Sequence, residues 1–167
     1  PVPSLEERRE DIPELTRHFI EGFNRSQGLP LRELTPEAEA MLRSVIVVEE
    51  KLDGANLGIS LGADGTLRVQ NRGQYLMPPY SGQFQRLGAW LAQHQTTLCE
   101  VLTRDLILFG EWCAARHSVA YERLPDWFIV FDVYKRAEGR FLSTTGRNAF
   151  ALRAGLAVVP ECFRGPA

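Results

Sequence analysis

At Val45 the spacing of apolar residues changes from that of helices to that of strands, and this change constrains the fold most strongly. Residues 1–43 before it carry apolar side chains at helical intervals. After it, residues 55–61 and 66–72 are predicted to form two strands joined by the turn GADG at residues 62–65. Strands paired through hairpins and flanked by helices predict an α+β fold with mostly antiparallel sheets, rather than a doubly wound parallel sheet.

Longer elements are expected after this hairpin. They are a helix over residues 83–103, apolar and mostly buried strands over residues 106–112 and 127–134, a helix over residues 145–154 that ends at Gly155, and a short last strand over residues 157–159. The tryptophans are scattered over different elements, which favours packing over a base-stacking platform for Trp90, Trp112 and Trp127.

The region before Val45 is predicted to contain two helices. Asp11 is the expected N-cap of the first helix, Pro13 lies in its first turn, and Gly28 is its expected end. The second helix is expected to begin at Thr35-Pro36.

Composition limits the function. With 44% apolar and 24% charged residues in 167, the chain is expected to be soluble and to bury a core. Its 19 basic residues nearly balance its 21 acidic ones, so any contact with RNA requires a local patch. No stretch approaches the ~20 apolar residues of a membrane span, and no signal peptide is visible. Three cysteines without a close pair favour a reducing, cytoplasmic location. The chain starts at Pro1 without methionine, which leaves open that it is a piece of a longer polypeptide.

Residues 45–56, VIVVEEKLDGAN, carry the strongest chemical signal. An apolar, strand-like run ends in two acids and then delivers Lys51, with a turn at Gly54. A lysine at the mouth of a buried strand, backed by a glycine turn, is placed as a nucleophilic amine would be. The alternative is a strand that ends in a charged hairpin with a solvated Lys51.

This segment resembles the Lys-x-Asp-Gly motif of the covalent nucleotidyltransferases, which are the DNA ligases, RNA ligases and mRNA capping enzymes. Glu50 and Asn56 beside the motif make it most similar to ATP-dependent RNA ligases. Further matches follow in the family's order: QNRG at residues 70–73, FGEW at residues 109–112 and WFIVFDVY at residues 127–134. The resemblance implies a ligase adenylylation domain, incomplete at its carboxyl end, in residues 44–167.

The same resemblance implies roles for single residues. Lys51 would be the adenylylated nucleophile, ATP its substrate and magnesium the metal, with the metal ligands unassigned. The implied nucleotide-binding residues are Glu50, Asn56, Arg72, Glu111 and Phe131. Phe131 would stack on the base, Glu111 would contact the ribose, and Arg72 would reach the ribose or the phosphates. The alternatives are an ordinary core aromatic for Phe131 and solvated strand-end charges for the other two.

The amine of a lysine attacks phosphorus only when it is neutral, whereas the pKa of a free lysine is near ~10.4. Nearby positive charge favours the neutral amine, and nearby carboxylates favour the charged one. Strand alternation is expected to place Glu49 and Lys51 on one face and Glu50 on the other. The two glutamates therefore oppose the reaction unless they point away or bind another group.

The implied reaction is adenylylation of the lysine, transfer of AMP to a 5′-phosphate RNA end, and sealing by a 3′-hydroxyl. The family's later motifs, an acid-glycine strand and a Lys-x-Lys pair, would lie beyond Pro160, and Lys135 is the only lysine after Lys51. The alternative is a catalytically deficient module that binds nucleotide or RNA ends. Arg116 and His117 are candidates for contact with phosphate, without an assigned role. No membrane contact is indicated, and protein partners are left open.

Residues 1–43 carry a separate resemblance. PSLEERREDIPELTRHFIEGFN followed by LTPEAEAML is similar to the helical lid of bacterial AAA+ activators that work with the alternative sigma factor. The phosphate-binding loop, metal-binding acid and sigma-contacting loop of those activators have no counterpart, so no ATPase activity of that kind is expected. We expect a helical pair that either packs against the ligase-like sheet or extends from it; a fragment of a transcription regulator is the remaining alternative.

Overall fold

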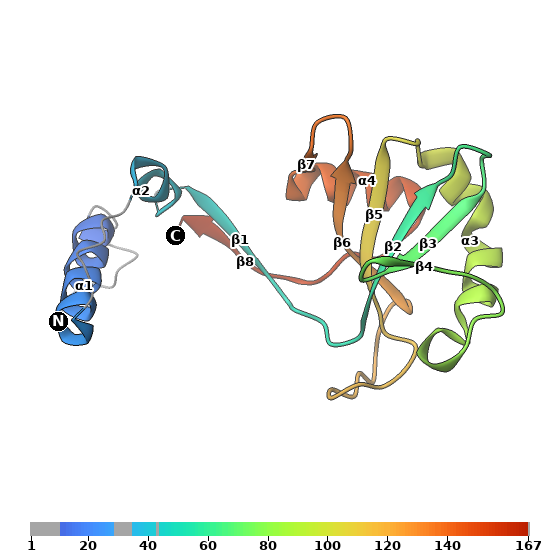
Figure 1. Cartoon of the computed structure of the whole chain (residues 1–167), viewed down its shortest axis with the longest axis horizontal. Helices are drawn as coiled ribbons and strands as arrows, with labels where there is room; N and C mark the ends of the chain where they lie inside the picture. The colour runs from blue at the N-terminus through green and yellow to red at the C-terminus, as the bar shows by residue number, and fades with distance from the viewer. Residues whose placement is uncertain (1–10, 29–34, 43, 167) are drawn as a thin grey trace. The chain divides into compact units, whose positions relative to one another are not determined.

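The computed structural model describes residues 11–28, 35–42 and 44–166. Contacts divide the chain into two units: one contains the described parts of Pro1–Val48 and Glu161–Ala167, and the other is Glu49–Pro160. The elements, labelled in Figure 1, are α1 (Ile12–Gln27), α2 (Pro36–Leu42), β1 (Val45–Glu49), β2 (Ala55–Leu61), β3 (Leu67–Asn71), β4 (Gln74–Leu76), η3 (Gly82–Phe84), α3 (Leu87–Val101), β5 (Leu106–Trp112), β6 (Phe128–Lys135), β7 (Arg140–Phe141), α4 (Thr144–Ala154) and β8 (Glu161–Pro166).

The larger unit is built on a six-stranded sheet in the order β4-β3-β2-β5-β6-β7, in which all neighbouring strands are antiparallel. The expected hairpin between β2 and β3 turns at Gly65, whose φ of 77° suits glycine. The Asp64 carboxylate fixes this turn by accepting hydrogen bonds from the backbone and hydroxyl of Thr66, at 3.1 and 2.8 Å. The predicted α+β fold is confirmed.

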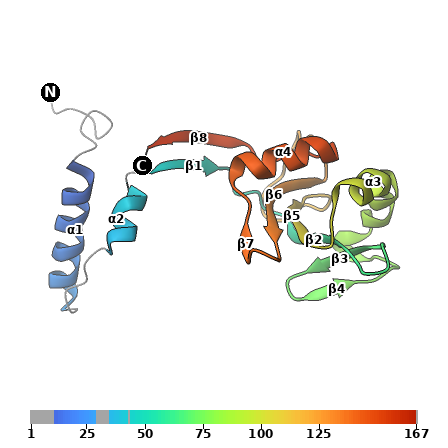
Figure 2. The same ribbon diagram turned by 90° about the horizontal axis from the view of Figure 1, so that it is seen from above.

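Helices α3 and α4 contact one another and cover the same face of this sheet (Figure 2). Alternate residues of the strands point toward them, as the two-residue period of a strand requires. The buried core between sheet and helices includes Ala55, Leu57, Ile59, Leu87, Trp90, Leu98, Leu108, Trp112, Phe128, Val130, Val133, Phe150, Ala151 and Ala154. The predicted packing role of the tryptophans is confirmed, because Trp90 and Trp112 are buried and the half-buried Trp127 ring contacts that of Trp112.

The smaller unit contains α1, α2 and a two-stranded sheet of β1 and β8. Gly28 ends α1 with a φ of 62°, and the Thr35 hydroxyl accepts a 3.2 Å hydrogen bond from the Ala38 N–H at the start of α2. The end of α1 at Gly28 and the start of α2 at Thr35 were both predicted. Residues 1–10, 29–34 and 43 of the predicted helical region lie outside the described residues.

Several local predictions are wrong. Asp11 occupies the predicted N-cap position of α1, but its side chain makes no capping hydrogen bond, because its own backbone is already helical, with φ −83° and ψ −16°. The helix predicted over residues 83–103 is a 3₁₀ turn followed by the shorter α3. Residues 157–159 do not form a strand; Val158 makes a single parallel bridge to Val130.

The strand before Lys51 is not buried either. Val45 and Val48 are 62% and 44% exposed, because β1 pairs only with β8, an element that the sequence did not predict. None of the helices in the described residues combines the length and apolar character needed to cross a bilayer.

Candidate functional site

A pocket of about 450 Å³ opens on the face of the sheet turned away from α3 and α4. Asn56 on β2 and Glu111 on β5 are cross-strand partners on this face, whereas their neighbours Leu57 and Trp112 point into the core. The residues that line the pocket are Glu50, Lys51, Leu52, Asn56, Arg72, Glu111, Phe131 and Val159. All six residues predicted for the site are therefore brought together, although they lie as far apart in the chain as Glu50 and Phe131.

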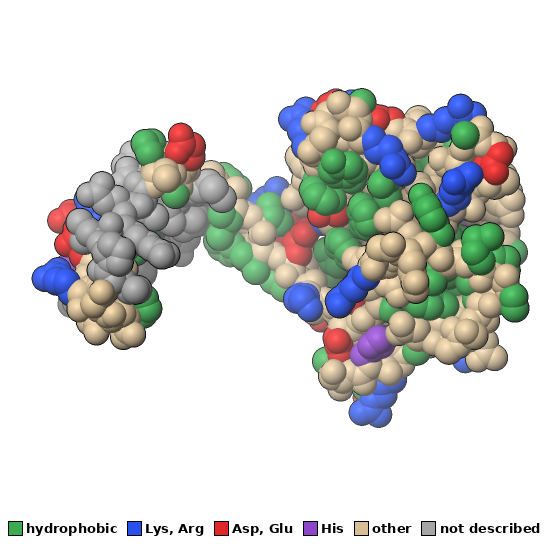
Figure 3. Space-filling view, in the orientation of Figure 1, with side chains coloured by type: hydrophobic (Ala, Val, Ile, Leu, Met, Phe, Trp, Pro, Cys, Tyr) green, Lys and Arg blue, Asp and Glu red, His purple; other side chains and the backbone are tan. Residues whose placement is uncertain are grey.

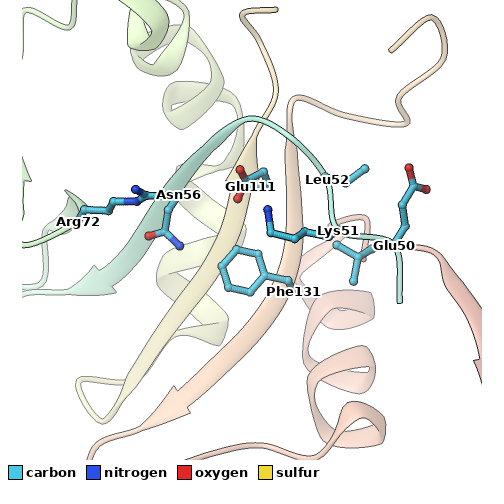
Figure 4. A pocket seen from close by; sticks show the side chains of 8 residues that line it. Glu50, Lys51, Leu52, Asn56, Arg72, Glu111 and Phe131 are labelled. Atoms are coloured by element: carbon cyan, nitrogen blue, oxygen red, sulfur yellow. The ribbon is translucent and has the colours of Figure 1, made fainter. Parts of the chain in front are cut away.

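Lys51 lies in the irregular segment between β1 and β2, and its side chain is exposed. Figure 4 shows its amine directed into the pocket, on the side of Glu111 and Phe131, while the Glu50 carboxylate extends away from it. The amine is thus accessible to a molecule in the pocket.

Gly54 fixes the backbone that follows Lys51. A Cβ atom at this position would lie 2.5 Å from the carbonyl oxygen of Trp112 and 3.1 Å from Cγ of Glu111, so the close approach to β5 requires glycine. The Gly54 N–H donates a 2.9 Å hydrogen bond to Glu111 Oε1. Glu111 therefore supports the motif's turn as well as lining the pocket.

Asp53 connects the Lys-x-Asp-Gly motif to the loop between β5 and β6 through hydrogen bonds. Its Oδ2 accepts hydrogen bonds from the backbone N–H groups of Val119 (3.0 Å) and Ser118 (2.8 Å), and these bonds hold the pKa of the carboxyl below its usual value. The backbone N–H of Asp53 donates to the Tyr121 hydroxyl at 2.6 Å. The sequence offered no sign of this link, because it joins residues 65 or more positions apart.

Arg116 and His117 lie in this same loop, and both are exposed. Neither is among the side chains that line the pocket. His117 is close enough to Asp53 to contribute to the low pKa of that carboxyl, so the loop brings this histidine near the Lys-x-Asp-Gly segment.

Glu49 does not share a strand face with Lys51, contrary to the expectation, because β1 ends at Glu49 and the alternation stops there. Its carboxylate instead binds the guanidinium of Arg147 on α4 through both oxygens, with 2.7 Å between Nη1 and Oε2. The sequence left open that this glutamate points away from Lys51 or binds another group, and the structure shows that it binds another group, Arg147.

An apolar wall closes one side of the pocket. Leu52, Ile129 and Val159 form a buried cluster, and the half-buried Phe131 packs against it. Leu52 and Val159 were not predicted as site residues. An apolar wall with an aromatic ring suits a flat aromatic group such as a nucleobase, which can stack on it.

Cys113 lies beside the motif, next to Gly54. Burial, followed by the nearby charges of Glu111 and Asp53, raises the pKa of its thiol to about 11. The thiol is therefore protonated at neutral pH and is not a rival nucleophile to Lys51.

Metal ligands stay unassigned. The described part of the chain holds no group of three or more His, Cys, Asp and Glu side chains that could bind a metal ion. Magnesium at nucleotide sites is commonly held by one or two carboxylates together with substrate phosphates, so a site of that kind needs fewer protein ligands than such a cluster provides.

Charged side chains on the visible face of the larger unit are interspersed. Figure 3 shows Lys and Arg in small separate groups among hydrophobic and acidic side chains, in keeping with the net charge of −2. RNA contact on this face would therefore depend on a few basic residues rather than on a broad basic surface.

Residues 44–167 match the model of the RNA ligase family. The chain belongs to the RNA ligase family. Among solved structures, this family member is similar to an archaeal ATP-dependent RNA ligase, with a TM-score of 0.60 and 24% identity over 79% of this chain and 35% of that one. It is also similar to the Naegleria gruberi RNA ligase with PPi, with a TM-score of 0.59 and 18% identity over 77% of this chain and 41% of that one. At this identity the similarity establishes the fold alone. The present chain spans less than half the length of either ligase structure.

Residues 6–46 match a second family, the AAA+ ATPase lid domain. This segment is similar to the DNA-binding transcriptional regulator NtrC of Escherichia coli K12, with 51% identity over 41 residues, and to that of Klebsiella pneumoniae, with 49%. The match covers 25% of this chain and 9% of each regulator. The resemblance of the N-terminal segment to an activator lid is confirmed at this level.

Proposed function

We propose that this chain carries the nucleotide-binding core of an ATP-dependent RNA ligase, in which Lys51 becomes covalently adenylylated. The single observation that carries the proposal is the convergence of Lys51 with the five predicted nucleotide-binding residues on one pocket. Packing alone gives charged and amide side chains such as Lys51, Arg72 and Asn56 no reason to converge on one pocket.

In the proposed first step the neutral Nζ of Lys51 attacks the α-phosphorus of ATP. The new N–P bond forms as the bond from that phosphorus to the bridging oxygen breaks, pyrophosphate leaves, and the amine loses a proton. Phe131 and the apolar wall would hold the base, while Arg72 and Glu111 would orient the ribose and phosphates. Magnesium carried on the phosphates would offset the negative charge that develops there.

The complete ligase would then transfer AMP to the 5′-phosphate of an RNA end and join it to a 3′-hydroxyl with release of AMP. Glu50 and Asn56 beside the motif support RNA as the substrate. We also propose residues 1–43 as a helical segment and residues 44–167 as a partial nucleotidyltransferase domain. The cytoplasm is the proposed location, where free thiols such as Cys99, Cys113 and Cys162 stay reduced.

Labelling with α-³²P-ATP tests the first step directly. The wild type is incubated with this nucleotide and magnesium, and retained label is measured on a denaturing gel. Lys135 is the only other lysine and offers a matched control, since it is held by Glu138 in a surface ion pair. We expect label on the wild type and on Lys135→Ala, none on Lys51→Ala, none from γ-³²P-ATP, and loss of label when pyrophosphate is added.

Label that persists in Lys51→Ala, or a wild type that is never labelled, contradicts the proposal. Equilibrium binding of ATP by an unlabelled wild type would instead support the alternative, a nucleotide-binding module without ligase chemistry.

A further inference from the structure

Arg147 is a buried arginine with all its guanidinium nitrogens bonded. It is 3% exposed on α4, and its Nη1 donates to Glu49 Oε2 at 2.7 Å and to the Phe131 carbonyl at 2.9 Å. Its Nη2 donates to the other Glu49 oxygen, and both Nη2 and Nε donate to Asn148 Oδ1, at 2.8 and 3.0 Å. A buried charge requires such complete pairing, because an unpaired one is strongly destabilising.

Arg147 binds two groups that lie close to the pocket in the chain: the Glu49 carboxylate and the Phe131 carbonyl. Glu49 precedes Lys51 by two residues, and Phe131 is the aromatic that lines the pocket. One guanidinium therefore joins α4 to both chain segments. A buried ion pair stabilises a fold less than apolar packing of the same volume. Its main effects here are therefore to fix the positions of the paired side chains and to compensate the charge of Glu49.

Charge is the effect that matters to a lysine nucleophile. Two residues of chain span at most about 7 Å between Cα atoms, so an uncompensated carboxylate at Glu49 would lie close enough to favour the ammonium form of the lysine, although the two side chains do not share a strand face; the ammonium form cannot attack phosphorus. Bidentate pairing with Arg147 offsets the charge of Glu49 and holds its side chain in one place. The other ionisable groups that face these residues are Asp132 on β6 beside the ion pair, and Glu50, Arg72 and Glu111 in the pocket.

We propose that Arg147 is a positioning residue for the Lys51 nucleophile: it holds and neutralises the Glu49 carboxylate and fixes β6 at Phe131. This inference rests on the proposed adenylylation of Lys51 and adds a residue that lies outside all the matched sequence motifs. It assigns to α4, a helix on the opposite face of the sheet, an effect on the chemistry in the pocket that acts through Glu49 and the backbone of Phe131.

The pH dependence of lysine–AMP formation tests it. Single-turnover rates at saturating ATP are measured from pH 5.5 to about 9.5 for the wild type, Arg147→Gln, Glu49→Gln and the double variant. Arg147→Gln leaves the Glu49 charge uncompensated and moves the midpoint of the profile to higher pH, by about half a unit or more. Glu49→Gln leaves the arginine unbalanced and moves the midpoint to lower pH. The double variant returns close to the wild type.

Two further variants keep the test decisive. Arg153→Gln changes an exposed arginine on the same helix and leaves the midpoint in place. Arg147→Lys keeps the charge but not the two-pronged geometry, so it slows the reaction without moving the midpoint. If Arg147→Gln does not fold, the acid shift of Glu49→Gln still decides the question, because a purely structural role for Arg147 predicts no such shift.

A purely structural role for Arg147 predicts that the variants react more slowly by the same factor at every pH. If all variants form lysine–AMP and their midpoints match that of the wild type, this inference is overturned while the proposed function stands. A wild type that takes no label would overturn the proposed function and the inference with it.

Discussion

The backbone N–H of Gly54 donates a 2.9 Å hydrogen bond to Oε1 of Glu111, which joins the turn after Lys51 to the central strand β5. Glu111 is half-buried and also lines the pocket. The same carboxylate that is proposed to orient the ribose therefore holds the nucleophile's own backbone in place. A change at Glu111 is expected to affect the stability of the fold as well as the binding of ATP.

Glu111→Ala is expected to lower the free energy of unfolding by about 1–2 kcal/mol, because it removes a charged acceptor and leaves the Gly54 N–H without it. Glu111→Gln keeps an acceptor oxygen and should cost less than half as much. All three tryptophans lie in the larger unit, so tryptophan fluorescence during urea unfolding reports on this unit. Equal losses in the two variants would show that the hydrogen bond does not stabilise the turn.

Gly54→Ala is expected to destabilise the larger unit by about 2 kcal/mol or more, since its Cβ would lie 2.5 Å from a backbone oxygen that cannot move aside. Gly88→Ala is the matched control. Its Cβ would meet only Tyr80 at 3.5 Å, and alanine in the first turn of α3 favours the helix. We expect it to be neutral or slightly stabilising in the same unfolding measurement. A Gly54→Ala variant as stable as Gly88→Ala would contradict the close approach to β5.

The parts of the fold that the sequence predicted are those with a local physical signal. Residues 106–112 form a mostly apolar run, and β5 has the predicted bounds. The site was predictable for another reason: Lys51 and Phe131 each lie in a short motif with a recognisable composition. Their convergence in one pocket follows from the register of β2, β5 and β6, which the motifs do not encode singly.

The parts that were missed depend on distant residues. The burial of Arg147 depends on Glu49, 98 residues away, which supplies its counter-charge. Val159 reaches the pocket through bonds of its segment to Val130, without forming a strand of its own. The apolar run of β1 looked like a buried strand, yet Val45 and Val48 are exposed, since burial depends on what a strand packs against.

Asp132→Asn is expected to stabilise the larger unit at pH 7. Burial raises the pKa of the Asp132 carboxyl. The nearby Arg147 opposes this effect, and the charge of Glu49 adds to it. A carboxyl whose pKa is higher in the folded state disfavours folding once it is ionised, so its cost appears as the pH rises above its unfolded value of about 3.9 and persists at neutral pH. The variant should unfold at a higher temperature than the wild type at pH 7, and this advantage should vanish near pH 3.5. An advantage of the same size at both pH values would rule out ionisation as its cause.

Phe131→Leu is expected to weaken ATP binding while preserving the fold. Leucine keeps the apolar contact with the cluster of Leu52, Ile129 and Val159 but removes the aromatic face. Stacking of a base on an aromatic ring contributes about 1–3 kcal/mol, so the ATP concentration for half-maximal labelling should rise roughly 5- to 150-fold.

Phe141→Leu provides the comparison for that change. Phe141 lies on β7 of the same sheet, is 52% exposed, and contacts the rings of Phe109 and Tyr134 away from the pocket. Its ATP dependence should match the wild type, with unfolding midpoints of both variants within a few degrees of it. If the two variants shift the ATP dependence equally, Phe131 acts on the sheet and not on the base. A selective shift in Phe131→Leu, with Phe141→Leu unchanged, would place the nucleobase against the apolar wall that Phe131 shares with Leu52 and Val159.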